Sequence, residues 1–263
     1  MTRVRARPPR VRLVCAVGAL AVVVGCTGTG KPTKRSAGPK APAPLTINLP
    51  AQPAPDAVTV ATGAVPEVPI FDQAGATSST RSITNPRPTG APAVFLVLQR
   101  RDGWDEVLLP IRPSGSSGWV READVTLSTH GWRIVVELAL HRMTVFHGPV
   151  VVRIETVGVG TAATPTPGGR YYTTELLQPA DPSGPYGSFA YGLNGFTGQA
   201  DGAGTGTGDA SAAGVFGQLG LHGTNDPSTL GRDVSLGCIR MSDDAMIALV
   251  GQLPLGVPVI VKA

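Results

Sequence analysis

The chain has 263 residues, 34 of them glycine and 25 proline, and only 15% are charged and 5% aromatic. This composition excludes a coiled coil or a charge-rich disordered protein, and the many glycines and prolines disfavour long helices. The net charge of +4 arises near the N-terminus, where five arginines lie among residues 1–12. Beyond residue 25, 17 basic residues face 18 acidic ones, so we expect no nucleic-acid binding.

Residues 1–25 have the pattern of a secretory signal peptide. Five arginines precede an apolar stretch from Leu13 to Gly25, which is shorter than a membrane-spanning helix. An uncleaved signal anchor is the alternative interpretation. The sequence Val23-Val24-Gly25-Cys26 resembles the lipobox of bacterial lipoproteins, which implies lipidation of Cys26 and a membrane anchor without a spanning helix. An ordinary signal whose last residue happens to be this cysteine would explain the same residues. We expect an exported protein that is lipid-anchored at the cell membrane and faces the cell wall or periplasmic space.

The three cysteines have different expected fates. Cys15 lies in the signal and Cys26 is the predicted lipidation site, which leaves Cys238 without a partner. Exported proteins usually pair their structural cysteines. Cys238 is therefore either a buried, inert thiol or a reactive group.

A linker and a small β domain follow the signal. Residues 26–56 are rich in proline and alanine, which predicts an extended linker. Residues 57–127 contain short β-branched or apolar runs between turn residues, which predict a small β domain. Its stretch from Trp104 to Val120 resembles the end of an SH3-like barrel of the bacterial cell-wall type. Its two tryptophans fit either a ligand groove or, more simply, a core. The predicted strands are 58–60, 69–71, 94–98, 106–109 and 118–120.

Residues 128–263 are predicted to form a second, larger domain that is again rich in strands. Alternation predicts a strand over 132–141, and 143–152 reads as a hairpin. A closing strand is expected over 256–261. One helix is predicted to begin at Ser242, with Met246, Leu249, Val250 and Leu253 on its apolar face and Pro254 beyond its end. The fold class is thus dominated by β-structure with one short helix.

The glycine-rich segment 192–217 is expected to be a flexible loop or lid. It lacks the Gly-Lys-Ser/Thr ending of a phosphate-binding loop, so nucleotide binding is not expected. The dispersed histidines and the absence of a Cys-x-x-Cys or His-x-x-x-His pair likewise argue against a metal site.

The surroundings of Cys238 suggest nucleophilic catalysis. A thiol becomes a useful nucleophile when a base or cation favours its thiolate, and His222 lies 16 residues upstream with a turn between them. Simpler explanations exist for each residue alone: His222 at a surface turn, Cys238 as a small buried hydrophobe, Arg240 as a solvated strand residue. Their joint occurrence favours a catalytic site.

The segments His222-Gly223-Thr224-Asn225 and Ser235-Leu236-Gly237-Cys238-Ile239-Arg240-Met241 resemble the catalytic motif of the L,D-transpeptidases, the YkuD-type domain. The turn 165–169 and the strand beginning at Gly256 are also similar to that family. Many members have a second histidine where this chain has Leu236. The resemblance implies a YkuD-type β-sandwich catalytic domain preceded by the small barrel.

The resemblance also implies an activity. Peptidoglycan tetrapeptide stems would be the donor, D-alanine the leaving group and a neighbouring stem's amine the acceptor for a 3→3 cross-link. Water as acceptor would make the same site a carboxypeptidase. Carbapenem-type β-lactams would be inhibitors, and no cofactor or metal would be needed. The implied roles are nucleophile for Cys238, base for His222, imidazole orientation for the Gly223 carbonyl, oxyanion hole and site support for Gly237 and Ser235, and substrate contact for Arg240 and Tyr191.

Two other functions are alternatives to the transpeptidase. A non-catalytic wall-binding lipoprotein is disfavoured by the intact His222 and Cys238. A papain-like cysteine amidase is disfavoured because such enzymes place cysteine at a helix start with histidine downstream, whereas here histidine comes first.

Overall fold

The computed structural model describes residues 57–197 and 217–263. The predicted signal peptide, Cys26, the linker to residue 56 and most of the expected lid lie outside the described residues. Within the described residues, strands dominate and the only α-helix is α1 (Asp243–Val250), which confirms the predicted fold class. No helix in these two ranges is long and apolar enough to cross a membrane.

The first sheet is antiparallel and contains five strands in the order β6-β5-β4-β1-β7. A separate two-stranded sheet pairs β2 with β3. All five predicted strands of this region are present, whereas β3 and β7 were not predicted. Since β7 pairs with β1 along its whole length, this sheet continues three residues past the expected boundary at residue 127. The strands are β1 (Val58–Gly63), β2 (Glu67–Ile70), β3 (Arg81–Thr84), β4 (Val94–Arg101), β5 (Trp104–Leu108), β6 (Ser117–Arg121) and β7 (Val125–His130).

The two tryptophans of the first sheet belong to its packed part. Trp119 is buried, and Trp104 packs edge-on against Phe71 with ring centroids 4.9 Å apart. The guanidinium of Arg121 lies over both Phe71 and Trp104. This packing favours the core interpretation of the tryptophans over a ligand groove. That the sheet is an SH3-like barrel remains a prediction.

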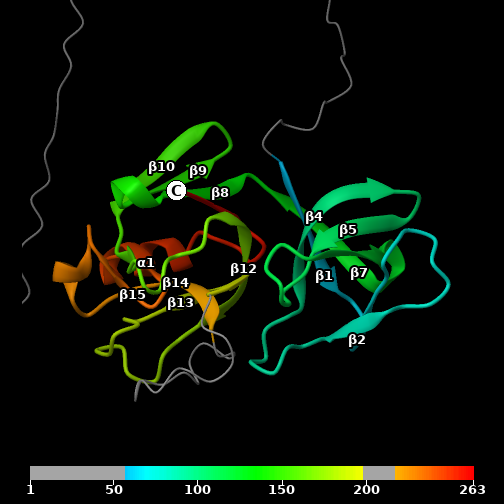
Figure 1. Ribbon diagram of the computed structural model, residues 1–263. Helices are drawn as coiled ribbons and strands as arrows, with labels where there is room; N and C mark the ends of the chain where they lie inside the picture. Colours follow the sequence, from blue (N-terminus) through cyan, green and yellow to red (C-terminus); the bar gives the residue numbers. More distant parts are fainter. Residues whose placement is uncertain (1–56, 198–216) are drawn as a thin grey trace, which may run out of the picture. The chain divides into compact units, whose positions relative to one another are not determined.

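The second sheet has eight strands in the order β10-β9-β8-β17-β12-β13-β14-β16. Its strands β8, β9, β10, β12, β13 and β14 are labelled in Figure 1. The predicted hairpin is present as β9 and β10, and the predicted closing strand is β17, which lies between β8 and β12. The strands are β8 (Trp132–Glu137), β9 (Arg142–His147), β10 (Val150–Thr156), β12 (Gly169–Leu177), β13 (Ala190–Phe196), β14 (Gln218–His222), β16 (Ile239–Arg240) and β17 (Pro258–Lys262). Short β11 (Val159–Gly160) and β15 (Asp233–Ser235) pair in parallel beside it.

One predicted strand is shorter than expected. The alternating pattern of residues 132–141 predicted a strand throughout, but β8 ends at Glu137 and Leu138–Leu140 form a 3-10 turn. Leu140 is consequently 58% exposed, although the pattern placed it on the buried face. The residue after the turn, His141, has a positive φ of 46°, which reverses the chain into β9.

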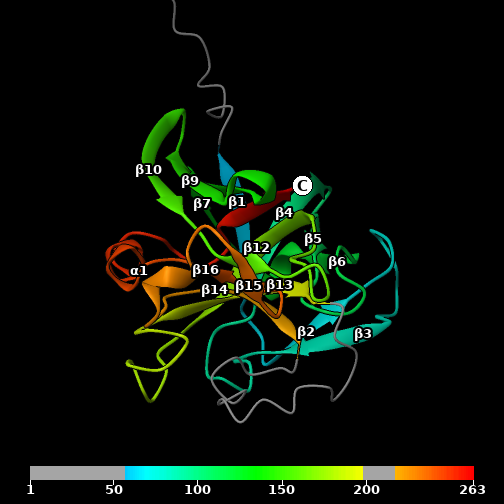
Figure 2. The ribbon, with the colours of Figure 1, turned by 60° about the vertical axis from the view of Figure 1, so that its left-hand side comes forward.

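Helix α1 begins where the sequence predicted. The Ser242 Oγ accepts a hydrogen bond from the Ala245 N–H at 3.3 Å, which caps the first turn. Met246 and Leu249 are buried in one cluster with Leu221 of β14 and Ile239 of β16, so α1 supports the two strands that flank the candidate catalytic residues (Figure 2). The helix ends at Val250, before Pro254.

A buried apolar cluster joins the two sheets. Val60, Leu96 and Leu108 of the first sheet pack against Tyr172 of β12. The Tyr172 hydroxyl lies 3.1 Å from the carbonyl oxygens of both Val94 and Leu108, to which it can donate. Burial raises the pKa of this phenol, so it stays a neutral donor.

Candidate active site

The pairing of β14 with β16 brings the two candidate catalytic segments together. These strands run parallel, with Leu221 opposite Ile239 and His222 opposite Arg240. Cys238 immediately precedes β16, and a Cβ on Gly220 would lie 3.6 Å from its Sγ. Because residues two apart on a strand face the same side, Gly220 leaves room for the thiol on the face that carries His222. The sequence prediction that these segments meet is confirmed.

His222 is held as a neutral imidazole. Its Nδ1 lies 2.6 Å from the Gly223 carbonyl oxygen, so Nδ1 carries the proton and Nε2 is left as the basic nitrogen. The side chain is 3% exposed, and the Tyr186 ring packs against it at an interplanar angle of 59°, with ring centroids 4.9 Å apart. Burial lowers the pKa of His222 to about 4; the Gly223 contact opposes this effect, and the charge of Arg240 adds to it.

The thiol of Cys238 is also neutral at rest. Burial raises its pKa, while the backbone at Gly220 and the charge of Arg240 act in the opposite direction. The Sγ–H points toward the Gln218 carbonyl oxygen, 3.9 Å away. A neutral thiol on the same face as a neutral imidazole is suited to general-base activation during attack, rather than to a preformed ion pair.

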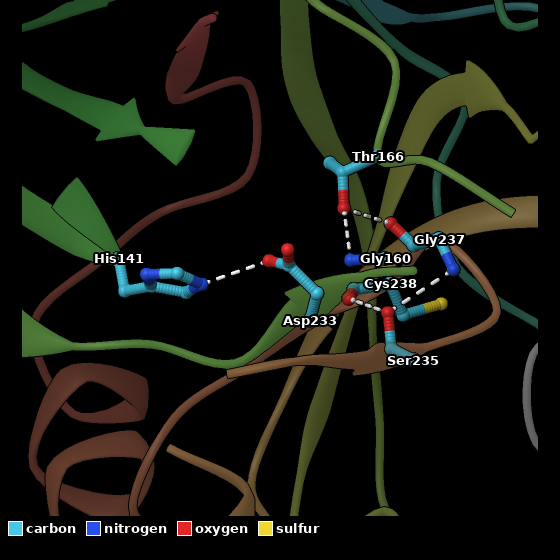
Figure 3. A network of polar contacts seen from close by, with 7 residues as sticks. All are labelled: His141, Gly160, Thr166, Asp233, Ser235, Gly237 and Cys238. Atoms are coloured by element: carbon cyan, nitrogen blue, oxygen red, sulfur yellow. Dashed lines mark hydrogen bonds and ion pairs between the residues drawn. The ribbon is translucent and has the colours of Figure 1, made fainter. Parts of the chain in front are cut away.

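Ser235 forms hydrogen bonds with the backbone of the loop that carries Cys238. Its Oγ donates to the Cys238 carbonyl at 2.6 Å and accepts from the Gly237 N–H at 3.1 Å (Figure 3). Ser235 is 1% exposed. The Gly237 amide is therefore occupied within the loop, while no hydrogen bond of the described residues uses the Cys238 N–H.

A tyrosine that no sequence pattern indicated, Tyr186, packs against the histidine. Tyr186 lies in the segment between β12 and β13, and Asp243 of α1 anchors that segment. Its two carboxylate oxygens accept from the Ser188 N–H at 2.7 Å and the Ser188 hydroxyl at 2.6 Å. The Asn225 side chain also donates to the Ser183 carbonyl at 2.6 Å. Only the acidic helix start was visible in the sequence, and it gave no sign of this contact.

The remaining predicted residues differ in their surroundings. Arg240 is partly buried, and its Nε has no hydrogen-bond partner among the described residues. Tyr191 is 1% exposed and its hydroxyl donates to the Leu253 carbonyl at 3.1 Å, so its side chain belongs to the core and the predicted substrate contact finds no support. Leu236 is 67% exposed and directly precedes Gly237 in the chain.

Other features of the described residues do not add to this site. A hollow of about 550 Å³ lies between His130, Trp132 and residues 250–255, and none of the predicted site residues lines it. Within residues 57–197 and 217–263, no group of three or more histidine, cysteine or acidic side chains is placed to hold a metal ion.

Comparison with known proteins identifies the second sheet region. Residues 131–261 match the family model described as the L,D-transpeptidase catalytic domain, YkuD. A Bacillus subtilis protein whose name assigns it to this family, YkuD, is 26% identical over 161 residues, which cover 59% of this chain and 84% of the relative. Its Bacillus licheniformis counterpart is 29% identical over 125 residues, 48% of this chain and 62% of the relative.

Solved structures give weaker similarities. An Enterococcus faecium L,D-transpeptidase variant matches with a TM-score of 0.38 and 21% identity, covering 50% of this chain and 49% of that one. L,D-transpeptidase 3 from Mycobacterium tuberculosis, in complex with a faropenem-derived adduct, matches with a TM-score of 0.39 and 18% identity, covering 56% and 73%. From the family model and the curated relatives, we conclude that residues 131–261 form an L,D-transpeptidase catalytic domain of the YkuD family.

Proposed function

We propose that this protein is an exported peptidoglycan L,D-transpeptidase that forms 3→3 cross-links through a Cys238 acyl-enzyme. The observation that carries the proposal is the pairing of β14 with β16. It sets the thiol against Gly220 on the face that carries His222, whose Nδ1 is fixed by the Gly223 carbonyl. Family membership supplies the reaction class.

The acylation step of the proposed reaction follows from the neutral state of both Cys238 and His222. As the Cys238 sulfur attacks the carbonyl that precedes the terminal D-alanine of a tetrapeptide stem, His222 Nε2 takes the thiol proton. The carbonyl oxygen becomes an oxyanion in the tetrahedral intermediate. When the C–N bond breaks, His222 returns the proton to the leaving nitrogen of D-alanine, and a thioester remains on Cys238.

The second half uses the same groups in reverse. An amine of a neighbouring stem attacks the thioester, His222 accepts its proton, and the sulfur leaves and is reprotonated. Water in place of the amine gives trimming of the stem. Transfer of the acyl group from one amide to another conserves most of its bond energy, so the cycle requires no nucleotide.

Arg240 is the proposed contact for a substrate carboxylate. Its Nε is buried without a partner, and its charge acts on both His222 and Cys238. A carboxylate bound there would satisfy this donor through a charge-assisted hydrogen bond. The same position beside the thiol suits the carboxylate of a carbapenem-type β-lactam, which we propose as an inhibitor class. The faropenem-derived adduct of the Mycobacterium tuberculosis relative is in line with that proposal.

The cellular location proposed is the outer face of the cell membrane. The support is the arginine-rich apolar start of the chain and the lipobox-like sequence before Cys26. A substrate in the cell envelope requires such export.

The test is mass spectrometry of the full chain incubated with disaccharide-tetrapeptide. We expect loss of D-alanine and appearance of a cross-linked dimer with the wild type, and neither with Cys238→Ala or His222→Gln. The control is His147→Gln, because His147 is exposed at the end of β9 and should leave the products unchanged. D-alanine release without dimer would restrict the activity to trimming. Equal products from Cys238→Ala would disprove the mechanism, and no product or adduct from any variant would favour a wall-binding lipoprotein.

A further inference from the structure

The hydroxyl of Thr166 connects the turn before β12 to the loop 236–238, which lies between β15 and β16 and carries Cys238. We call this segment the nucleophile loop. Thr166 is 4% exposed, and its Oγ1 accepts a hydrogen bond from the Gly160 N–H at 2.8 Å. The same hydroxyl donates to the Gly237 carbonyl at 2.8 Å (Figure 3). Since the Gly160 amide can only donate, the hydroxyl proton of Thr166 is committed to Gly237.

This contact sets the direction of the peptide that joins Gly237 to Cys238. In a trans peptide the C=O and the N–H point to opposite sides. With the Gly237 carbonyl held toward Thr166, the Cys238 N–H is directed away from Thr166, and no hydrogen bond of the described residues uses it. The Gly237 N–H is bound to Ser235 Oγ, so the Cys238 N–H is the available backbone donor beside the sulfur.

The conformational freedom of Gly237 means that the peptide after it needs a hydrogen bond from another segment to keep one orientation. Its φ is +119°, in a region that glycine adopts readily and other residues rarely adopt. A peptide that follows such a residue has several accessible orientations, and only one of them presents the Cys238 N–H to an oxyanion. Ser235 fixes the Gly237 N–H and the Cys238 carbonyl. Thr166 fixes the Gly237 carbonyl, which lies between those two groups along the backbone.

We propose that Thr166 is a positioning residue that orients the Gly237–Cys238 peptide so that the Cys238 N–H stabilises the oxyanion formed during acylation. The inference rests on the proposed function and assigns a role to the turn 165–169. Removal of one oxyanion donor lowers rates by about 10²–10³. Because Thr166→Val releases the peptide rather than deleting its N–H, we expect a decrease of about 10- to 100-fold in acylation rate.

The test compares two reactions of the same sulfur in the full chain. Acylation by faropenem passes through an oxyanion, whereas alkylation by iodoacetamide displaces iodide at a saturated carbon and forms none. Both rates are followed by mass spectrometry of the peptide that contains Cys238, and kcat and KM are measured from D-alanine release from the tetrapeptide. The variants are Thr166→Val, Thr166→Ser and Thr173→Val. Thr173 is the matched control, because its hydroxyl is also buried and also bonded to the backbone. It accepts a hydrogen bond from the Val257 N–H and lies within reach of the Pro254 carbonyl.

We expect Thr166→Val to lower the acylation rate and kcat while KM and the alkylation rate stay within about twofold of wild type. Thr166→Ser should restore acylation, and Thr173→Val should acylate as the wild type does. Equal slowing of acylation and alkylation in Thr166→Val would show a merely structural role and overturn the inference. Wild-type acylation in Thr166→Val would overturn it while leaving the proposed function intact. A wild-type protein that reacts with iodoacetamide but with neither faropenem nor tetrapeptide would overturn both.

Discussion

At the scale of single residues, burial sets the protonation states of the proposed catalytic pair, His222 and Cys238. His222 is covered by Tyr186 and has a pKa of about 4, and burial raises the pKa of Cys238. At a pH above the pKa of His222 and below the raised pKa of Cys238, both groups are neutral. The proposed base is therefore in its active form at neutral pH, and protonation of His222 in acid removes the acceptor for the thiol proton.

This arrangement predicts how Tyr186 affects the pH profile. Tyr186→Ala should expose the imidazole and raise its pKa from about 4 toward the ordinary value of about 6.5. The acid limb of the kcat/KM profile should move to higher pH by about one unit or more, because kcat/KM reports groups of the free enzyme. Tyr186→Phe keeps the ring over His222 and is the control. An acid limb at the same pH in wild type, Tyr186→Phe and Tyr186→Ala would contradict this explanation.

The proposed catalytic residues and the tyrosine packed against His222 were not equally predictable. His222, Gly223 and Cys238 belong to two short segments with a specific residue pattern, so the sequence was enough to predict that they meet. Tyr186 covers His222 because Asp243 binds Ser188, a contact between segments that are distant in the chain. No local pattern reports such a contact.

At the scale of elements, the nucleophile loop between β15 and β16 depends on Gly237. A Cβ at this position would clash with the Thr197 side chain, and the positive φ of +119° is unfavourable for any other residue.

We expect Gly237→Ala to reduce acylation of Cys238 by about 10²-fold or more, because the peptide before the sulfur must shift. The measurement is the rate of adduct formation with faropenem, together with thermal unfolding. Gly251→Ala is the control, since Gly251 has an ordinary φ of −74° and nothing within 4 Å of its added Cβ. Unchanged acylation in Gly237→Ala would contradict the described loop.

The elements themselves were predicted unevenly. Strands rich in valine, isoleucine and leucine were predicted, and so was α1 from its serine cap. β12, β13 and β14 were not, because glycine, threonine and polar residues interrupt their apolar pattern. The buried Thr173, Thr174 and Asn194 illustrate this, since polar side chains occupy core positions there through hydrogen bonds.

At the scale of the whole described unit, the two sheets are expected to unfold together. Tyr172 of the second sheet is fully buried against Val60, Leu96 and Leu108 of the first, and its hydroxyl reaches two carbonyls of the first sheet. Sequence patterns could not predict this contact, because it depends on how the faces of two sheets meet.

Tyr172→Phe should lower the free energy of unfolding by about 1–2 kcal/mol, because it removes a buried hydrogen-bond donor and leaves the ring in place. Urea unfolding followed by tryptophan fluorescence and by far-UV circular dichroism should give one coincident transition, shifted to lower urea. D-alanine release should not change under native conditions, since Tyr172 packs against the first sheet rather than around Cys238 and His222. Two separate transitions in the wild type would contradict the joint unfolding of the sheets.

We propose that Cys238 carries the acyl group, and this is tested by the intact mass of the protein after brief incubation with tetrapeptide donor and no acceptor amine. We predict a mass increase equal to the donor minus D-alanine, located by peptide mapping on Cys238 and absent in Cys238→Ala. The adduct should disappear when an acceptor amine is added. D-alanine release at the wild-type rate from Cys238→Ala, or an acyl group on a residue other than Cys238, would contradict the account.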